Sequence, residues 1–390
     1  MQTLPLTDQE IAAWLRLAMA PGLGPAALRR LLAAFGLPEA VLSQTFAALA
    51  GVAGDAAARA ALAPPAADFQ AHLDAVRAWH ELPGNALVTL GDPAYPPLLL
   101  TMPDPPPLLY AKGRIDLLHA RSVAVVGSRS ATPQGVEDAT RFARAFADAG
   151  LTVVSGLASG VDAAAHRGAL QGRGSTVAVI GTGADIVYPA AHHTLAHQIA
   201  DGGAILSEWP LGTPARSAHF PQRNRLIAGM VSGVLVVEAA MRSGSLITAR
   251  LANEMGRDVF AIPGSIHAPL ARGCHRMIKQ GAKLVETPED VLEELGLSAQ
   301  ASGAVASSGS NIIALKPHAS KEQRDDGARL PPEAERLLDA LGHSPTTLEI
   351  LAERTDMHDT LLQSMLLRLE LAGELCALPG GRYVRATHSG

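Results

Sequence analysis

The sequence contains little cysteine: Cys274 and Cys376 are its only two, and they lie far apart without CxxC spacing. That usage excludes a disulfide-stapled scaffold and a cysteine-built zinc site, and it suits a reducing compartment. The chain also lacks an uncharged apolar run of about 18 residues, so no membrane span is predicted. Its first residues include acids and lack the basic-then-apolar pattern of a signal peptide, so we expect a cytoplasmic protein.

Positive charge is not in excess either, since the formal net charge is −5. A generally cationic surface is therefore not expected, and any nucleic-acid site would have to be a local basic patch. Apolar residues make up 48% of 390 residues, which is enough for two or three domains with separate cores.

What is present is organised around the stretch 122–160. An apolar, β-branched run from Ser122 ends at Gly127-Ser128-Arg129, an amphipathic segment follows to Gly150, and a second apolar run ends at a Ser-Gly turn. This pattern predicts a βαβ unit with a buried parallel strand. Ligands of such sheets bind beyond the carboxyl ends of the strands, where helix-start amides favour anions.

The α/β alternation continues to about residue 285 and predicts a Rossmann-like, doubly wound, mostly parallel sheet. We expect strands at Val123–Val126, Thr152–Val154, Val177–Ile180, Ala204–Ser207, Val234–Val237, Val259–Ile262 and Lys283–Val285, and helices at Gln134–Ala149, Asp162–Gln171, Arg225–Met230, Leu246–Met255 and Gly273–Gln280. The proline-rich segment 91–113 carries many Leu and Tyr residues, so we interpret it as an ordered, extended strap.

Helical regions flank this core. Residues 1–85 predict short helices joined by Pro21-Gly22-Leu23-Gly24-Pro25, which resembles a helix-hairpin-helix (or SAM-like) domain. Glycine amides of such a hairpin can hold a DNA phosphate, but a purely structural turn is the favoured interpretation. The core with its strap spans 86–297, and 298–328 has the composition of a flexible linker.

Residues 329–390 predict three helices and a β-hairpin, a pattern that resembles a winged-helix domain. In DNA-binding versions the third helix supplies basic residues to the major groove. Here Arg368 is the only positive charge in that helix, so a protein-docking or structural role is favoured.

Several loops that follow the predicted strands hold small or basic residues. We place 216–225 in the loop after the fourth strand and 238–248 after the fifth, and the two groups add four arginines to Arg129. Because parallel strands end at one edge of the sheet, these loops should line one crevice suited to phosphate.

Four of these runs together resemble the DNA-processing protein A family, also called Smf. They are Val-Ala-Val-Val-Gly127-Ser-Arg129, Ser155-Gly-Leu-Ala-Ser-Gly-Val-Asp162-x-x-x-His166, Phe220-Pro-x-Arg-Asn-Arg225-x-Ile-Ala-Gly229 and Glu238-Ala-x-x-x-Ser-Gly-Ser-Leu-x-Thr248-Ala. The resemblance covers about 91–295. It implies a homodimer, formed through the Rossmann-like domain, that binds and protects single-stranded DNA and loads the RecA recombinase during natural transformation. It implies no turnover of the DNA, no catalytic residue, no cofactor and no metal.

By this resemblance, arginines neutralise phosphates, small residues shape the anion pocket, Phe220 stacks a base or merely packs in its loop, and Lys279 extends the groove. The expected DNA-contacting residues are Gly127, Ser128, Arg129, Ser155, Gly156, Ser159, Gly160, Phe220, Arg223, Asn224, Arg225, Arg242, Ser243, Gly244, Thr248 and Lys279. His275 stands where the family usually has asparagine.

The alternative is an enzyme. The Gly-Ser-Arg turn and later Ser-Gly-Ser also resemble nucleoside-monophosphate phosphoribohydrolases, but the glutamate expected in their motif is replaced by Ala249 and Arg250. A nicotinamide dehydrogenase is disfavoured because the first turn lacks GxGxxG.

Histidines and serines offer weaker signals. His192, His193 and His197 offer helical i, i+4 spacing, yet no cysteine or carboxylate lies close in sequence to complete a metal site. Ser155 and Ser159 precede His166, which falls inside a predicted helix and is expected to pack there instead of acting as a base. Asp162 is predicted to be the N-cap of that helix.

Overall fold

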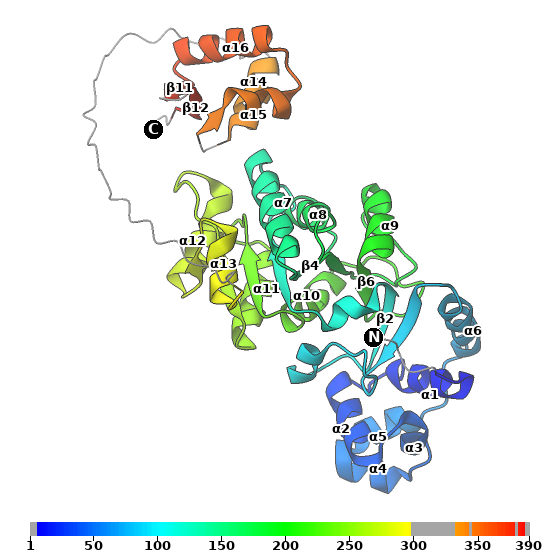
Figure 1. Cartoon of the computed structure of the whole chain (residues 1–390). Helices are drawn as coiled ribbons and strands as arrows, with labels where there is room; N and C mark the ends of the chain where they lie inside the picture. The colour runs from blue at the N-terminus through cyan, green and yellow to red at the C-terminus, as the bar shows by residue number, and fades with distance from the viewer. Residues whose placement is uncertain (1–5, 298–331, 343–344, 379–380, 387–390) are drawn as a thin grey trace, which may run out of the picture. The chain divides into compact units, whose positions relative to one another are not determined.

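The computed structural model describes residues 6–297, 332–342, 345–378 and 381–386, and these divide into two units, 1–291 and 292–390. The first unit contains a nine-stranded sheet in the order β1-β2-β6-β5-β4-β3-β7-β8-β9 (Figure 1). Its strands are β1 (Asn85–Thr89), β2 (Leu108–Gly113), β3 (Ser122–Val126), β4 (Thr152–Ser155), β5 (Thr176–Val179), β6 (Ala204–Ser207), β7 (Gly233–Val236), β8 (Asp258–Ala261) and β9 (Lys283–Leu284). Strands β3 to β9 are parallel, as predicted, and β1 and β2 add an antiparallel edge.

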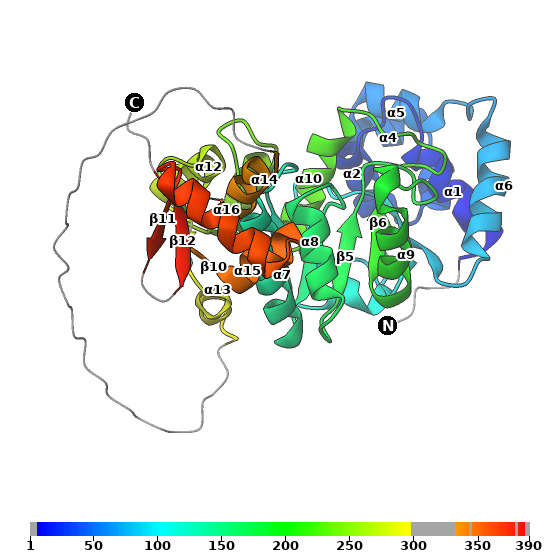
Figure 2. The same ribbon diagram turned by 90° about the horizontal axis from the view of Figure 1, so that it is seen from above.

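Helices cover both faces of the sheet (Figure 2). Three follow β3, β4 and β5 and lie on one face: α7 (Pro133–Asp148), α8 (Val161–Ala169) and α9 (His193–Gly202). On the other face lie α10 (His219–Gly229), α11 (Ser245–Glu254) and α12 (Arg272–Lys279), followed by α13 (Pro288–Glu294). The predicted doubly wound fold is confirmed, and the direction of winding reverses between β3 and β7. Ligands of such sheets bind at this switch point.

The strap prediction is refined by the structure. Residues 108–113 of this extended segment form strand β2, which pairs with β6. A 3₁₀ turn (η1, Pro97–Thr101) precedes it, and Tyr95 in this segment is buried, with its hydroxyl donating to the Pro106 carbonyl. A second 3₁₀ turn, η2 (Ile115–His119), leads into β3, and η3 (Ala190–His192) and η4 (Pro269–Ala271) precede α9 and α12.

The N-terminal helices pack on the antiparallel edge of the sheet, formed by β1 and β2. They are α1 (Asp8–Ala18), α2 (Pro25–Phe35), α3 (Pro38–Leu42), α4 (Phe46–Ala53), α5 (Asp55–Leu62) and α6 (Phe69–His80). Leu15 of α1 and Trp79 of α6 share a core with Leu87 and Tyr110 of β1 and β2. The Arg29 guanidinium of α2 also donates to the carbonyls of Leu100 and Met102.

The second unit has the winged-helix pattern. Helices α14 (Pro332–Leu341), α15 (Leu348–Thr355) and α16 (Asp359–Leu371) precede the hairpin β11 (Leu375–Leu378) and β12 (Arg382–Arg385). The sequence did not predict β10 (Thr346–Thr347), which completes the three-stranded sheet β10-β12-β11. Its core comes from apolar residues of all three helices and Leu375. The predicted linker, 298–328, lies outside the described residues.

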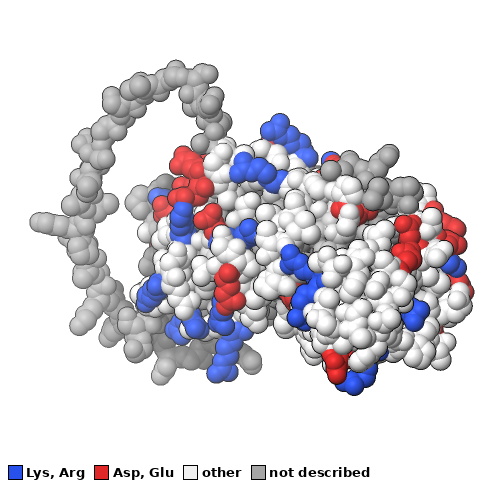
Figure 3. Space-filling model, turned by 90° about the horizontal axis from the view of Figure 1, so that it is seen from below, with Lys and Arg blue, Asp and Glu red and all other residues white. Residues whose placement is uncertain are grey.

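No helix within the described residues combines the length and the apolar character that crossing a bilayer requires. In Figure 3 the basic residues lie in separate groups on the face shown, with acidic residues among them. This distribution agrees with the expectation that any anion site is local.

Candidate nucleic-acid interface

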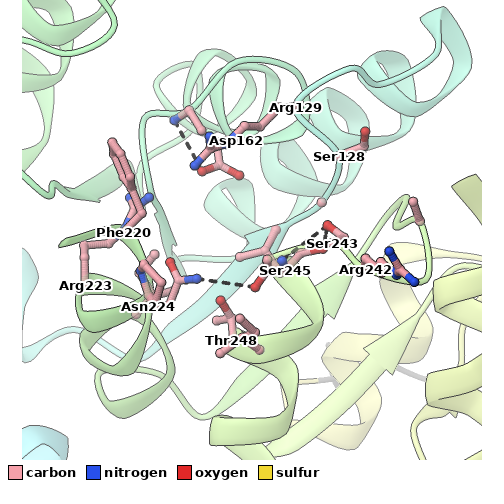
Figure 4. A pocket seen from close by; sticks show the side chains of 18 of the residues that line it. Ser128, Arg129, Asp162, Phe220, Arg223, Asn224, Arg242, Ser243, Ser245 and Thr248 are labelled. Carbon is pink, nitrogen blue, oxygen red and sulfur yellow. Dashed lines mark hydrogen bonds between the residues drawn. The ribbon is translucent and has the colours of Figure 1, made fainter. Parts of the chain in front are cut away.

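A cavity of about 780 Å³ opens at the switch point between β3 and β7, and we call it the switch-point pocket. Its walls come from the loops after β3 and β7, from α10 and from the start of α11 (Figure 4). Ten of the sixteen predicted residues line it: Gly127, Ser128, Arg129, Phe220, Arg223, Asn224, Arg242, Ser243, Gly244 and Thr248.

Hydroxyl and amide groups form one wall of the pocket. The Ser243 and Ser245 hydroxyls lie 2.7 Å apart, and Asn224 Nδ2 donates to the Gly244 carbonyl over 3.4 Å. The Ser128 hydroxyl accepts from the Ser130 amide, and Thr248 is buried at the pocket's floor. These groups are the kind that hold phosphate oxygens without reading bases.

Two arginines of the pocket are exposed, Arg129 and Arg242. Neither forms an ion pair with a carboxylate within the part of the chain that the structure describes. The Arg129 guanidinium carbon instead lies 5.1 Å from the centre of the Phe220 ring, a cation–π arrangement. Both charges are therefore available to an anion in the pocket.

Arg223 lies in the pocket wall but is buried, with 3% of its surface exposed. Its Nη1 donates to the carbonyls of Gly156 and Val179, and burial lowers its pKa to about 10, so it stays cationic at neutral pH. Its Nη1 is therefore engaged by the backbone and not directed at a ligand, and direct contact of Arg223 with a phosphate stays a prediction. Arg223 joins α10 to the ends of β4 and β5.

The prediction that Asp162 is the N-cap of α8 is wrong. The N-cap is Gly160, and Asp162 is the second residue of the helix. Its Oδ2 accepts from the amides of Gly156 and Ala158, which fixes the preceding loop. Burial raises the pKa of this carboxyl, and the nearby Arg223 charge opposes the rise.

The predicted small residues of the β4–α8 loop act behind the pocket. A Cβ on Gly156 would lie 1.9 Å from Arg223 Nη1, and one on Gly160, whose φ is +74°, would lie 2.2 Å from the Ser128 carbonyl oxygen. These glycines therefore let α10 and the Ser128–Arg129 turn approach closely. Ser155 donates to the Val125 carbonyl, and Ser159 is exposed, but neither lines the pocket.

Two predicted residues lie elsewhere. Arg225, two residues from Arg223, faces a second cavity of about 530 Å³ on the other side of α10. There it pairs with Glu208 and Asp104, so the prediction that it lines the phosphate crevice is wrong. Lys279 lies on α12 beside Met241, Arg272 and Arg276, outside the switch-point pocket.

The loop prediction for residues 216–225 is also wrong from His219 onward, since α10 begins there. The His219 ring stacks on Trp209 at 3.7 Å, and its Nδ1 lies 3.0 Å from the Gly181 carbonyl oxygen, which anchors the helix start. Phe220 is therefore held on a helix. The sequence analysis missed this helix because Pro221 in its first turn suggested a loop.

Tyr188 was missed altogether. It lies between β5 and η3, and it lines the pocket beside Phe220. Its Tyr-Pro dipeptide at the end of a strand-end loop was the signal that could have revealed it.

The histidines that the sequence singled out form packing and backbone contacts in the structure. His166 is buried, with Nε2 accepting from the Leu157 amide and Nδ1 2.7 Å from the Thr176 hydroxyl, and burial lowers its pKa to about 3. His192 and His197 each contact a backbone carbonyl through Nδ1. Within the described residues no cluster of three potential metal ligands occurs.

Comparisons with known proteins identify the family of the chain. Residues 86–296 match the family model of DNA recombination-mediator protein A, and 321–381 match that of the DprA winged helix domain. The chain belongs to the DNA recombination-mediator protein A family. This membership confirms the resemblance drawn from the four sequence runs.

Individual relatives extend the match. The chain is 42% identical to the protein Smf of Escherichia coli, over 79% of each chain. The X-ray structure of DNA processing protein A from Streptococcus pneumoniae matches with a TM-score of 0.63 and 40% identity, covering 75% of this chain and 99% of that one. A structure of DNA processing protein A from Helicobacter pylori, described for its single-stranded DNA binding mode, matches with a TM-score of 0.50 and 29% identity. The match covers 54% of this chain and 95% of that one.

Proposed function

We propose that the protein binds single-stranded DNA in the switch-point pocket. The observation that carries the proposal is the pair of exposed guanidinium groups, Arg129 and Arg242, which form no ion pair within the described residues and lie on a pocket that also presents hydroxyls and Phe220. Cations track the phosphates and an aromatic ring accepts any base, which is the combination used for single strands without sequence preference. The single-stranded DNA binding described for the Helicobacter pylori relative supports the same role.

The proposal includes no turnover of the DNA. Asp162 is the one carboxylate among the described residues that line the pocket, and it accepts two amide hydrogen bonds. A phosphoribohydrolase would need a carboxylate directed at the glycosidic bond. That enzyme remains the alternative, and it predicts release of ribose phosphate from nucleoside monophosphates.

We also propose the wider role that the family resemblance implies: protection of incoming DNA and loading of RecA during natural transformation, in the cytoplasm. The family's description as a recombination mediator supports the part of this role that concerns recombination. The same proposal includes a homodimer formed through the Rossmann-like domain. It also includes the division of the chain into a helical domain (1–85), the core (86–297), a linker (298–328) and a winged-helix domain (329–390). Light scattering and pull-down with purified RecA test the assembly and the partner.

The first test is a salt titration of binding to fluorescent oligo-dT and to duplex DNA of equal length. We expect a preference for the single strand in the wild type. In the double variant Arg129→Ala, Arg242→Ala the slope of log affinity against log salt should fall by about 1.4, because each lost phosphate contact removes about 0.7.

The matched control is Arg144→Ala, an exposed arginine of α7 that does not line the pocket. It should keep the wild-type slope. An unchanged salt slope in the double variant would show that DNA does not bind in the switch-point pocket. Absence of single-strand binding at low salt, together with ribose-phosphate release, would favour the enzyme.

A further inference from the structure

Tyr188 is a large aromatic side chain that the fold leaves 49% exposed at the rim of the switch-point pocket. Its ring centre lies 5.7 Å from that of Phe220, with an angle of 37° between the planes. Two rings this close leave no room for a base between them, so they form one continuous surface.

Phe220 is covered on several sides. The Arg129 guanidinium lies over its ring, Tyr188 contacts it, and a Cβ on Gly181 would be only 3.4 Å from its Cδ1. Phe220 is also less exposed than Tyr188. The open part of the surface therefore belongs mainly to Tyr188.

The backbone that carries Tyr188 is fixed. The Thr182 hydroxyl donates to the Ile186 carbonyl, the Gly183 amide donates to Thr213, and the Asp185 carboxylate accepts from the Gly212 amide. The ring is thus exposed on an anchored loop. An exposed aromatic held in this way loses little further entropy when it binds a flat partner.

We propose that Tyr188 is the residue on which a base of the bound strand stacks, and that Phe220, which its ring contacts, supports it from behind. This inference rests on the proposed function and makes it more specific: the bases meet Tyr188 while the phosphates follow Arg129 and Arg242. Tyr188 contacts no phosphate in this arrangement, so it contributes affinity without contributing to the salt slope.

The test compares oligo-dT with an oligonucleotide of equal length that lacks every base. Tyr188→Ala should weaken oligo-dT binding roughly tenfold, since stacking on one aromatic contributes about that much. It should leave binding to the abasic strand and the salt slope unchanged. Tyr188→Phe should bind both strands as the wild type does, because the ring alone is needed.

Leu37→Ala, at a residue 55% exposed in the N-terminal helices, is the matched surface control and should change neither affinity. Tyr188→Trp gives a second readout that does not depend on the alanine variant folding: its added fluorescence should be quenched by oligo-dT and not by the abasic strand.

Equal losses on both strands, or no loss on oligo-dT, would overturn the role of Tyr188 while leaving the proposed function intact. A tryptophan at 188 that oligo-dT does not quench would do the same. If the wild type binds neither strand at low salt, the proposed function itself fails, and the inference fails with it.

Discussion

Helix α10 separates two cavities that both contain arginine but differ in their acids. On one side, the switch-point pocket presents Arg129 and Arg242 without an ion pair in the described residues. On the other side, Arg225 pairs with Glu208 and Asp104 against the N-terminal helices. The same side-chain type is thus available to a ligand in one cavity and neutralised in the other. Local acids, and not the count of arginines, decide where an anion can bind.

The second cavity also bears on the N-terminal hairpin. Leu23 and Pro25 line it together with Asp104 and Glu208. A hairpin that faces carboxylates is poorly placed to hold a phosphate. The geometry therefore favours the structural role for this turn that the sequence already suggested.

The largest effect is expected from a substitution that removes the link between α10 and the sheet. Arg223→Ala leaves the Gly156 and Val179 carbonyls unpaired in the interior, so we expect the free energy of unfolding to fall by about 3 kcal/mol. Urea unfolding measures it. Arg144→Ala should stay within about 0.5 kcal/mol of the wild type. A loss below about 1 kcal/mol for Arg223→Ala would mean that the buried arginine is not needed for the fold.

A smaller effect is expected from the acid of the second cavity. Burial raises the pKa of Glu208 to about 7, against the opposing effect of Arg225. Between about pH 4.5 and 7 the folded state keeps a proton that the unfolded state releases, so the free energy of unfolding should fall as pH rises through this window.

Glu208→Gln cannot ionise and should remove that part of the pH dependence, as measured by thermal unfolding at a series of pH values. Glu254→Gln, an exposed glutamate of α11, serves as the control and should keep the wild-type profile. If Glu208→Gln also keeps it, Glu208 is ionised throughout the window.

The smallest expected effect concerns DNA. Arg225→Ala should change the salt slope of oligo-dT binding by less than about half of the 0.7 that one phosphate contact contributes. Its guanidinium is held by Glu208 and Asp104 in the cavity away from the pocket. A slope reduced by a full contact would show that Arg225 leaves those acids to meet the strand, and the contrast between the cavities would be lost.

Much of the fold followed from sequence pattern. The β-branched runs identified the seven parallel strands to within one or two residues, because a buried parallel strand needs apolar side chains on both faces. Strand β2 was missed because it lies in the proline-rich segment 91–113, and β1, Asn85–Thr89, was missed because it is short. Helix α10 was begun too late because its first turn, His219 to Arg223, carries proline and polar side chains that read as a loop.

The sequence by itself determined the family, the doubly wound sheet and ten residues of the pocket, because strand ends and small residues are encoded locally. The tertiary structure alone decided which arginines are free. Arg223 and Arg225 are near neighbours in sequence, yet Arg223 donates to buried backbone carbonyls and Arg225 pairs with two acids. One of these acids, Glu208, is 17 residues away in the sequence, and the other, Asp104, is much more distant. Tyr188 joined the site for the same reason. Contacts between distant segments, such as that of Tyr188 with Phe220, arise only when the sheet is assembled, so a local pattern can suggest a residue but cannot fix its partners.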